Sequence, residues 1–267
     1  MGAIMIDSCR LCNSKRLKIL ERVGFEKQFA YYRCLDCKLV NYDITAGINQ
    51  EKYAEVFIDP FLDNHPINLN QAASYNYIRK HVKSATSLFE IGFGNGRILH
   101  LASKDGLQVA GLELSSFLVE SVKEKLKLPV MQADFMENTT LENIKWDIVV
   151  LRHVLEHFPD SEIVMNRIRD LLSPRGYALI EVPNIDSWEL KYKRFLRRYH
   201  IYKKKYSKNF VPGHCNEFCK DSFSYLMKKT GFKLLSWQTY SHKPAVDLIY
   251  KVIPVGNKVR AIIQKER

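Results

Sequence analysis

The sequence lacks any apolar run long enough to cross a lipid bilayer, over all of its 267 residues. Its first residues carry neither the charged region nor the cleavage site of a signal peptide, and Ile6 stands where an N-myristoylation motif needs Ser or Thr. Internal repeats and low-complexity tracts are absent too. We therefore expect a cytoplasmic globular protein whose six cysteines stay reduced, as metal ligands or as buried thiols.

The order of the apolar segments indicates an α/β fold. From Thr86 to Tyr240, strand-like and helix-like patterns alternate, and runs such as Ile148–Leu151 suit strands that are buried on both faces. This alternation predicts a mostly parallel sheet with helices on both sides. The chain divides into a cysteine-bearing segment, a helical linker, a core domain with an insertion, and a tail: 1–45, 46–85, 86–245 with the insertion 185–211, and 246–267.

A glycine-rich turn follows the first strand of the core domain. The strand contains Glu90 and runs directly into three alternating glycines, Gly92, Gly94 and Gly96. Glycine lets the backbone approach a ligand that a Cβ would push away, and the preceding acid suits a ligand with a positive charge. A second acid, Glu113, ends the next strand, where a carboxylate could bind both hydroxyls of a ribose.

The nicotinamide-binding pattern G-x-G-x-x-G does not fit this turn, because Arg97 stands where that pattern needs Gly or Ala. The turn instead resembles the first motif, E/D-x-G-x-G-x-G, of class I S-adenosylmethionine (SAM)-dependent methyltransferases. The resemblance implies a Rossmann-like class I methyltransferase fold. It also implies that the three glycines line the methionine and ribose of SAM and that Glu113 binds the ribose. We assign Leu114, beside Glu113, to the same site.

The segment Met131–Phe135 resembles the next motif of that family. In the family an acid there hydrogen-bonds the adenine amine and an apolar neighbour covers the ring, and these roles fall on Asp134 and Phe135. The alternative role for Asp134 is a cap of the following turn. Arg152 follows the apolar strand that begins after Asp147. Ligands of open α/β sheets bind at the carboxyl ends of strands, so Arg152 completes the predicted cofactor site.

The segment Arg152–Asp160 closely resembles the stretch after the fourth strand of many small-molecule methyltransferases, which places His153 where acceptor and methyl donor meet. Ubiquinone-pathway O-methyltransferases and small-RNA 2′-O-methyltransferases carry E-x-x-E-H here, in part as a divalent-metal site. His153 replaces the first acid of that motif, which disfavours magnesium because magnesium prefers oxygen ligands. The alternative to a metal site is that Glu156 and His157 fix the local turn and the start of the following helix. The H-x-x-E-H pattern of zinc peptidases also matches, but the preceding buried strand argues against it.

Two histidines are candidates for the base on the acceptor side, His214 and His153. The family often places a histidine like His214 before the last core helix, facing the acceptor, and an imidazole can take a proton from a hydroxyl that attacks the methyl group. The alternative for His214 is a surface position in a loop. The D/N-P-P-Y motif of amino-directed DNA and protein-glutamine methyltransferases is absent.

Four cysteines form two C-x2-C pairs that are separated by 21 residues: Cys9, Cys12, Cys34 and Cys37. Each pair can close a tight turn that aims two thiolates at one point, and two such turns make a closed tetrahedral site. The spacing predicts a structural zinc in a zinc-ribbon-like module, with two pairs of buried thiols as the alternative. The module resembles the zinc-binding N-terminal segment of some sugar and cell-surface glycan methyltransferases. We expect the other two cysteines, Cys215 and Cys219, to be ordinary core thiols.

The insertion contains nine Lys or Arg residues and no acid between Lys191 and Lys208. The net charge of the whole chain is +12, and this segment supplies most of that excess. Aromatic and apolar residues recur at helical spacing from Tyr192 to Tyr206, which predicts a basic amphipathic helix. This helix could be a lid over the acceptor site, an interfacial helix on anionic lipid, a surface that reads phosphates, or simply a packed surface helix. A membrane-touching insertion in related quinone-pathway enzymes favours the first two.

We therefore expect a SAM-dependent methyltransferase that modifies a hydroxyl of a glycan or another small acceptor, in cell-surface polysaccharide or related biosynthesis. A zinc-containing RNA methyltransferase is the alternative enzyme, disfavoured because the basic residues are concentrated in one segment. A SAM- or zinc-binding scaffold without activity is the alternative from another class, and the intact glycine turn argues against it. The expected location is cytoplasmic, with contact to the inner face of the membrane through 191–208.

Overall fold

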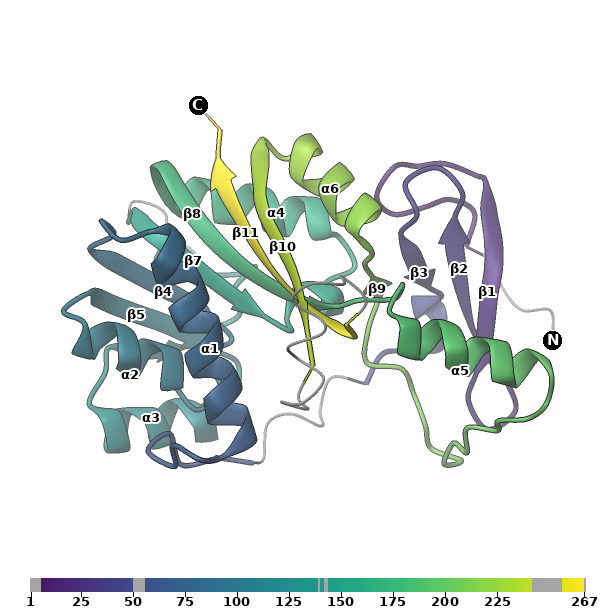
Figure 1. The fold of residues 1–267 in the computed structure, drawn as a ribbon, viewed down its shortest axis with the longest axis horizontal. Coiled ribbons are helices and arrows are strands. Elements are labelled where there is room, and N and C mark those ends of the chain that lie inside the picture. The colour runs from purple at the N-terminus through teal and green to yellow at the C-terminus, as the bar shows by residue number, and fades with distance from the viewer. Residues whose placement is uncertain (1–5, 50–55, 139, 142–143, 242–255, 267) are drawn as a thin grey trace.

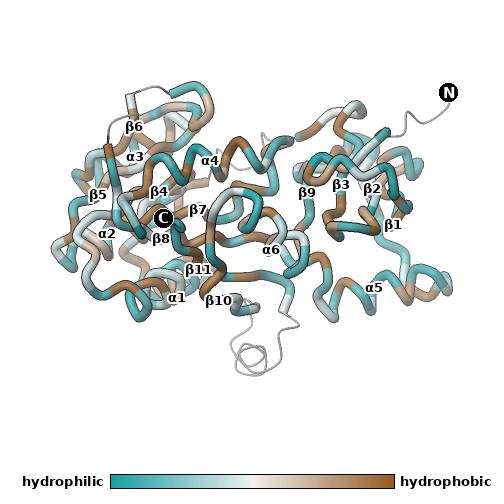
Figure 2. The backbone as a smooth tube through the Cα atoms, turned by 90° about the horizontal axis from the view of Figure 1, so that it is seen from above, coloured by the Kyte–Doolittle hydropathy of each residue, from teal (hydrophilic) through white to brown (hydrophobic). Residues whose placement is uncertain are grey.

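The structure is a computed structural model, and it describes residues 6–49, 56–138, 140–141, 144–241 and 256–266. A large sheet flanked by helices occupies one end of the molecule, and a small sheet that contains the N-terminal segment occupies the other (Figure 1). Hydrophobic residues lie along the central strands of the large sheet (Figure 2). Among the described residues, no helix is both long and apolar enough to span a membrane.

The large sheet has the order β10-β11-β8-β7-β4-β5-β6. The neighbours from β8 to β6 pair in parallel, and β11 pairs antiparallel with both β8 and β10. The predicted mostly parallel sheet is therefore confirmed. Its strands are β4 (Ser87–Ile91), β5 (Gln108–Glu113), β6 (Val130–Gln132), β7 (Trp146–Arg152), β8 (Leu172–Pro183), β10 (Phe232–Tyr240) and β11 (Lys258–Lys265).

Helices cover both faces of this sheet. Successive strand residues point to opposite sides, so each face presents its own apolar side chains to the helices. Ile148 and Val150 of β7 belong to the apolar cluster under α1, α2 and α3, whereas Val149 and Leu151 belong to the cluster under α4 and α6. The helices on the first face are α1 (Pro66–His81), α2 (Arg97–Lys104) and α3 (Ser116–Leu126). Those on the second are α4 (Ser161–Leu171) and α6 (Lys220–Lys229).

The small sheet has the order β1-β2-β3-β9, with all pairs antiparallel. The cysteine-bearing segment supplies β1 (Leu17–Val23), β2 (Phe29–Cys34) and β3 (Val40–Tyr42), and the short helix η1 (Ile44–Ala46) follows. The fourth strand, β9 (Asn216–Glu217), comes from the loop before α6. The predicted segment 1–45 therefore shares its sheet with the domain that follows, and its Arg33 makes two 2.7 Å hydrogen bonds to Asp186.

The insertion 185–211 contains a shorter helix than predicted. Helix α5 spans Trp188–Arg198, and the left-handed backbone of His200, with φ at +59°, comes just after its end. Tyr206 lies beyond the helix and packs with Phe210 against the cluster around Phe29 on the small sheet. The insertion thus lies beside the small sheet (Figure 1).

The predicted tail 246–267 needs a correction, because β11 lies within the large sheet. This strand pairs along its whole length with β10 on one side and with most of β8 on the other. Val259, Ala261 and Ile263 are all fully buried in the apolar cluster under α4 and α6. The residues 246–255 of the predicted tail lie outside the described part of the chain.

Candidate active site

The glycine turn after β4 forms the first wall of the site. Gly92, Gly94 and Gly96 have φ values of +70°, +57° and +73°, which other residues adopt only with strain. A Cβ on Gly92 would lie 2.7 Å from Cγ2 of Val154, whereas a Cβ on Gly94 would meet no atom within 4 Å. The turn therefore packs against the loop after β7 at Gly92 and leaves open space at Gly94, where a ligand can approach the backbone.

Glu113 links the end of β5 to this turn. Its Oε2 accepts a 3.1 Å hydrogen bond from the Gly94 backbone N–H, and its Oε1 accepts one of 2.9 Å from Leu114. A carboxylate has about four lone-pair directions, so Glu113 keeps acceptor capacity for hydroxyls of a ligand while it holds the turn. The side chain of Leu114 is 61% exposed beside it. The second acid and the glycine turn thus meet as the sequence predicts.

Glu90 is a buried acid with an oxygen that has no hydrogen-bond partner among the described residues, Oε2. Burial raises the pKa of Glu90 to about 8, against the opposing effect of the Arg152 charge. A positive charge next to this oxygen would stabilise the ionised carboxylate. The site therefore has the chemistry to hold an ammonium group.

The two residues assigned to adenine lie just after β6. The Oδ1 atom of Asp134 accepts a 2.6 Å hydrogen bond from the backbone N–H of Met136, so this carboxylate caps the turn. Phe135 is 2% exposed, with the Arg167 guanidinium 5.2 Å from its ring centroid. The capping role of Asp134 is therefore present, and the adenine contacts of both residues stay predictions.

Arg152, at the end of β7, belongs to a buried network around Glu181 of β8. Its Nε lies 2.8 Å from Glu181 Oε2, and Nε of Arg260 lies 3.0 Å from Oε1. The hydroxyl of Tyr240 donates to Oε2 at 2.8 Å. Glu181, Tyr240 and Arg260 are not marked by any sequence motif, and Arg260 lies on a strand outside the predicted core domain, so these three residues were not predicted.

His153 is held in a left-handed conformation, with φ at +54°. Its backbone N–H donates to the Glu181 carbonyl at 2.8 Å. Its Nε2 lies 3.2 Å from the Tyr240 hydroxyl, and its Nδ1 lies 3.6 Å from Glu156 Oε1. These contacts place the imidazole of His153 between the Glu181 network and a second polar cluster.

This second cluster consists of Glu156, His157 and His214, which we call the histidine cluster. Glu156 and His157 lie on the short helix η3 (Leu155–His157), and His214 comes from the loop before β9. One ligand atom of each lies within 4.8 Å of the others, and both carboxylate oxygens of the buried Glu156 lack a hydrogen-bond partner among the described residues. A carboxylate and two imidazoles can accept protons, and the same atoms can ligate a transition metal.

The two imidazoles of the cluster differ in protonation. Nδ1 of His157 donates to the Gly213 carbonyl at 2.6 Å, and Nδ1 of His214 lies 2.8 Å from Glu217 Oε1. Burial lowers the pKa of His157, in spite of the Glu156 charge. Burial has the same effect on His214, but Glu217 and Glu156 outweigh it and raise the pKa of His214 to about 9. At neutral pH the cluster therefore pairs a neutral imidazole with an imidazolium.

The four predicted metal-binding cysteines come together at one end of the small sheet, where Cys34 ends β2. The Sγ atoms of Cys9 and Cys37 are 3.5 Å apart, as are those of Cys12 and Cys34. All four sulfur atoms lie within 4.8 Å of one another. The predicted convergence of the two C-x2-C turns is therefore confirmed.

Comparison with known families and relatives agrees with this geometry. Residues 51–236 match the family described as "Methyltransferase domain". The ubiquinone biosynthesis O-methyltransferase of Pasteurella multocida is 25% identical over 158 residues, which cover 52% of this chain and 65% of that protein. The protein of the same name from Coxiella burnetii is 23% identical over 160 residues, which cover 58% and 65%. The chain thus spans less than two thirds of the length of these relatives.

Solved structures show the same fold. A SAM-dependent methyltransferase from Archaeoglobus fulgidus superposes with a TM-score of 0.54 at 18% identity, over 74% of this chain and 93% of that one. The N-methyltransferase NodS from Bradyrhizobium japonicum, solved with S-adenosylhomocysteine, gives 0.53 at 12% identity, over 78% and 93%. The large sheet and its helices therefore form a Rossmann-like methyltransferase fold. Because the family match covers more than half of its residues, the chain belongs to this family of methyltransferase domains.

Proposed function

We propose that this protein transfers a methyl group from SAM to a hydroxyl of a small acceptor. The observation that carries the proposal is the open, left-handed Gly94 between two acids, Glu113 and the buried Glu90. When bound, SAM supplies a methyl group on a positively charged sulfur. Glu90 suits the ammonium group of SAM, Glu113 suits its ribose, and the exposed Leu114 offers an apolar surface to its adenine.

An oxygen acceptor is supported by the printed names of the curated relatives, which are O-methyltransferases. The finer assignment to a glycan rests on the resemblance of the cysteine module. Formation of S-adenosylhomocysteine, measured with separate panels of catechols, sugars and RNA, tests the class of acceptor directly. Turnover with sugars supports the glycan assignment, turnover with RNA alone overturns the small-acceptor proposal, and turnover with catechols supports a small acceptor of another kind.

The histidine cluster supports a proton route on the acceptor side. A base must be unprotonated at the working pH. The lowered pKa of His157 keeps its imidazole neutral, whereas His214 stays protonated up to about pH 9. We therefore assign the base to His157 in place of His214, and His153 stays the predicted alternative. Because Val154 fills the space beside Gly92, the loop that carries His157 adjoins the proposed donor site.

We further propose that the four cysteines bind one structural zinc. Four tetrahedral Zn–S bonds of about 2.3 Å place sulfur atoms about 3.8 Å apart, close to the 3.5 Å between Cys9 and Cys37. A site with four thiolates has no open position, which suits a structural metal rather than a catalytic one.

A third proposal concerns the exposed face of α5, which we assign to anionic membrane surfaces. Trp188, Tyr192, Phe195 and Tyr199 recur at helical spacing and are between 55% and 69% exposed. Lysines with exposed side chains follow the helix, at 203–205 and 208. Aromatic rings beside exposed positive charges suit the interface of an anionic bilayer. Contact at the inner face of the cytoplasmic membrane is the location that this proposal implies.

Replacement of Gly94 by Val tests the donor site. The new side chain would fill the open space beside the turn, so we expect the dissociation constant for SAM in calorimetry to rise at least tenfold. Gly106→Val is the matched control, because Gly106 also has a positive φ and open space around it but lies after α2. Equal losses in the two variants would mean that backbone strain, not the ligand, explains the effect.

Replacement of His157 by Gln tests the base. We expect turnover to fall about 10²–10⁴-fold with SAM affinity retained. In the wild type, turnover should rise with pH through the pKa of His157, which lies below its usual 6.5, and then stay level up to pH 8. A turnover that instead rises through pH 9, with His157→Gln fully active and His214→Gln inactive, would give the role to His214.

Metal analysis of the purified chain tests the zinc site. We expect one zinc per chain in the wild type and little in Cys37→Ser, because three thiolates hold the metal less tightly than four. Cys219→Ser is the control, since Cys219 is buried outside the cluster and should leave the zinc content unchanged. A metal-free wild type whose unfolding is insensitive to chelators contradicts the proposal.

Sedimentation with lipid vesicles tests the α5 surface. The double variant Tyr192→Ser, Phe195→Ser should lose most of its binding to vesicles of phosphatidylglycerol, and wild-type binding should weaken with salt. Phe117→Ser, at an exposed ring on α3, is the control. Arg194 and Arg197 are unsuitable targets, because they bond to Ile185 and Glu21 within the molecule. Binding that survives in the double variant argues against the surface.

A further inference from the structure

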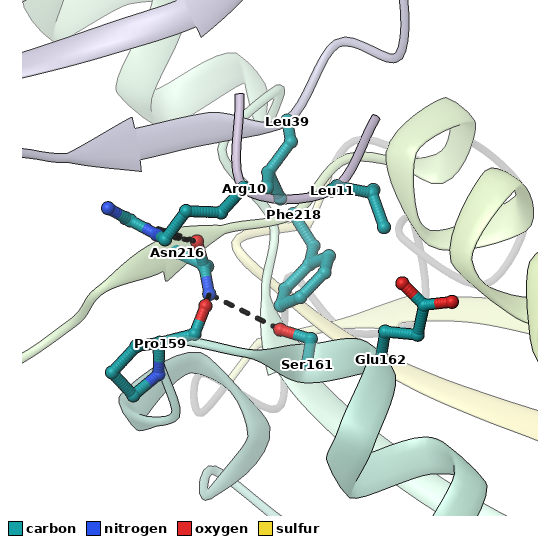
Figure 3. Close-up of a pocket in the computed structure, with 8 residues that line it drawn as sticks. All are labelled: Arg10, Leu11, Leu39, Pro159, Ser161, Glu162, Asn216 and Phe218. Carbon is teal, nitrogen blue, oxygen red and sulfur yellow. Dashed lines mark hydrogen bonds between the residues drawn. The ribbon is translucent and has the colours of Figure 1, made fainter. Parts of the chain in front are cut away.

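Arg10 lies inside the first cysteine turn but directs its side chain out of it. Its guanidinium donates to the carbonyls of Tyr42, at 2.9 Å, and Cys215, and its Nε and Nη2 both lie 3.3 Å from Asn216 Oδ1. Figure 3 shows Arg10 reaching toward Asn216 at the junction of the two sheets. A planar guanidinium with several donors fixes geometry better than a single hydrogen bond does.

The other end of Arg10 is fixed by the cysteine cluster. Its own backbone N–H donates to Asn41 Oδ1 at 3.0 Å, and Nδ2 of Asn41 lies 3.5 Å from Sγ of Cys9. Because Cys9 and Cys12 both belong to the cluster, a metal bound there restrains the backbone between them. The position of the Arg10 side chain therefore depends on the state of the cluster.

Two residues that Arg10 contacts, Cys215 and Asn216, are hydrogen-bonded to the segment that carries Glu156 and His157. The backbone N–H of Cys215 donates to the Glu156 carbonyl at 2.8 Å, and its thiol donates to the His157 carbonyl at 3.0 Å. Nδ2 of Asn216 donates to the Phe158 carbonyl at 2.8 Å and lies 3.2 Å from Ser161 Oγ (Figure 3). His214 immediately precedes Cys215 in the same loop.

We propose that Arg10 is a positioning residue for His157 and His214, and that the four-cysteine cluster acts on methyl transfer through it. The proposal rests on the function proposed above for the histidine cluster. A shift of about 1 Å in a catalytic group can cost about 10²-fold in rate, so release of the 213–217 loop impairs proton transfer. The donor site lies on other loops, after β4 and β5, and keeps its affinity for SAM.

Histidine NMR of the ligand-free, zinc-loaded chain tests this without any acceptor. In Arg10→Met we expect the imidazole signals of both cluster histidines to move and their pKa values to change, with zinc content and the SAM dissociation constant within twofold of wild type. Arg16→Met is the matched control, because Arg16 pairs with Asp36 in the same module at an exposed position. Arg10→Lys keeps part of the hydrogen bonding and should give intermediate shifts.

With an acceptor from the panel above, turnover in Arg10→Met should fall about 10–100-fold, and in Arg16→Met it should stay within twofold. Unchanged histidine signals and unchanged turnover in a zinc-loaded Arg10→Met overturn the proposal. If Arg10→Met does not fold, Arg10→Lys decides by the same criteria. Failure of the wild type to bind SAM would overturn the proposed function instead, and the histidine signals would still decide whether Arg10 positions the cluster.

Discussion

The buried carboxylate of Glu181 is the constraint on which the carboxyl-end edge of the large sheet depends. Its burial opposes ionisation, but Arg152 and Arg260 outweigh that effect and lower the pKa of Glu181 to about 2. The carboxylate is therefore ionised at neutral pH. A buried carboxylate is tolerated only with good partners, and here these come from four elements: Ser74 of α1, Arg152 of β7, Tyr240 of β10 and Arg260 of β11.

This network links β11 to β8 in addition to the backbone pairing and the apolar core. Arg260 points from β11 toward Glu181 on the neighbouring strand, and the two residues are direct partners in the antiparallel register. The carbonyl of Glu181 also accepts from His153, which holds the chain in a left-handed turn just after β7. That turn directs the chain toward Val154 at the glycine turn and toward Glu156 and His157 beyond it. One buried charge thus sets the start of the loop that joins the two halves of the site.

Features that depend on local spacing could be predicted from the sequence. The glycine turn, Glu113 and the cysteine pairs are of this kind, because a few consecutive residues determine the shape of each turn. Strand β9, strand β11 and the Glu181 network could not be predicted, because each depends on pairing between segments far apart in the chain. The proposal of His157 over His214 as the base also rests on surroundings that exist only in the folded chain. Burial in the folded chain lowers the pKa of His157, whereas Glu217 and Glu156 outweigh burial and raise the pKa of His214.

The same long-range contacts decide how the cysteine module should be regarded. An independent domain has its own core and few contacts across its boundary. Here Leu11 and Leu39 belong to the same buried cluster as Phe218 and Phe223 of the methyltransferase domain, and β9 closes the small sheet. Movement of the module relative to the large sheet would break this core, the β3–β9 pairing and the Arg33–Asp186 ion pair together. The module is therefore a structural part of the same folded unit as the large sheet.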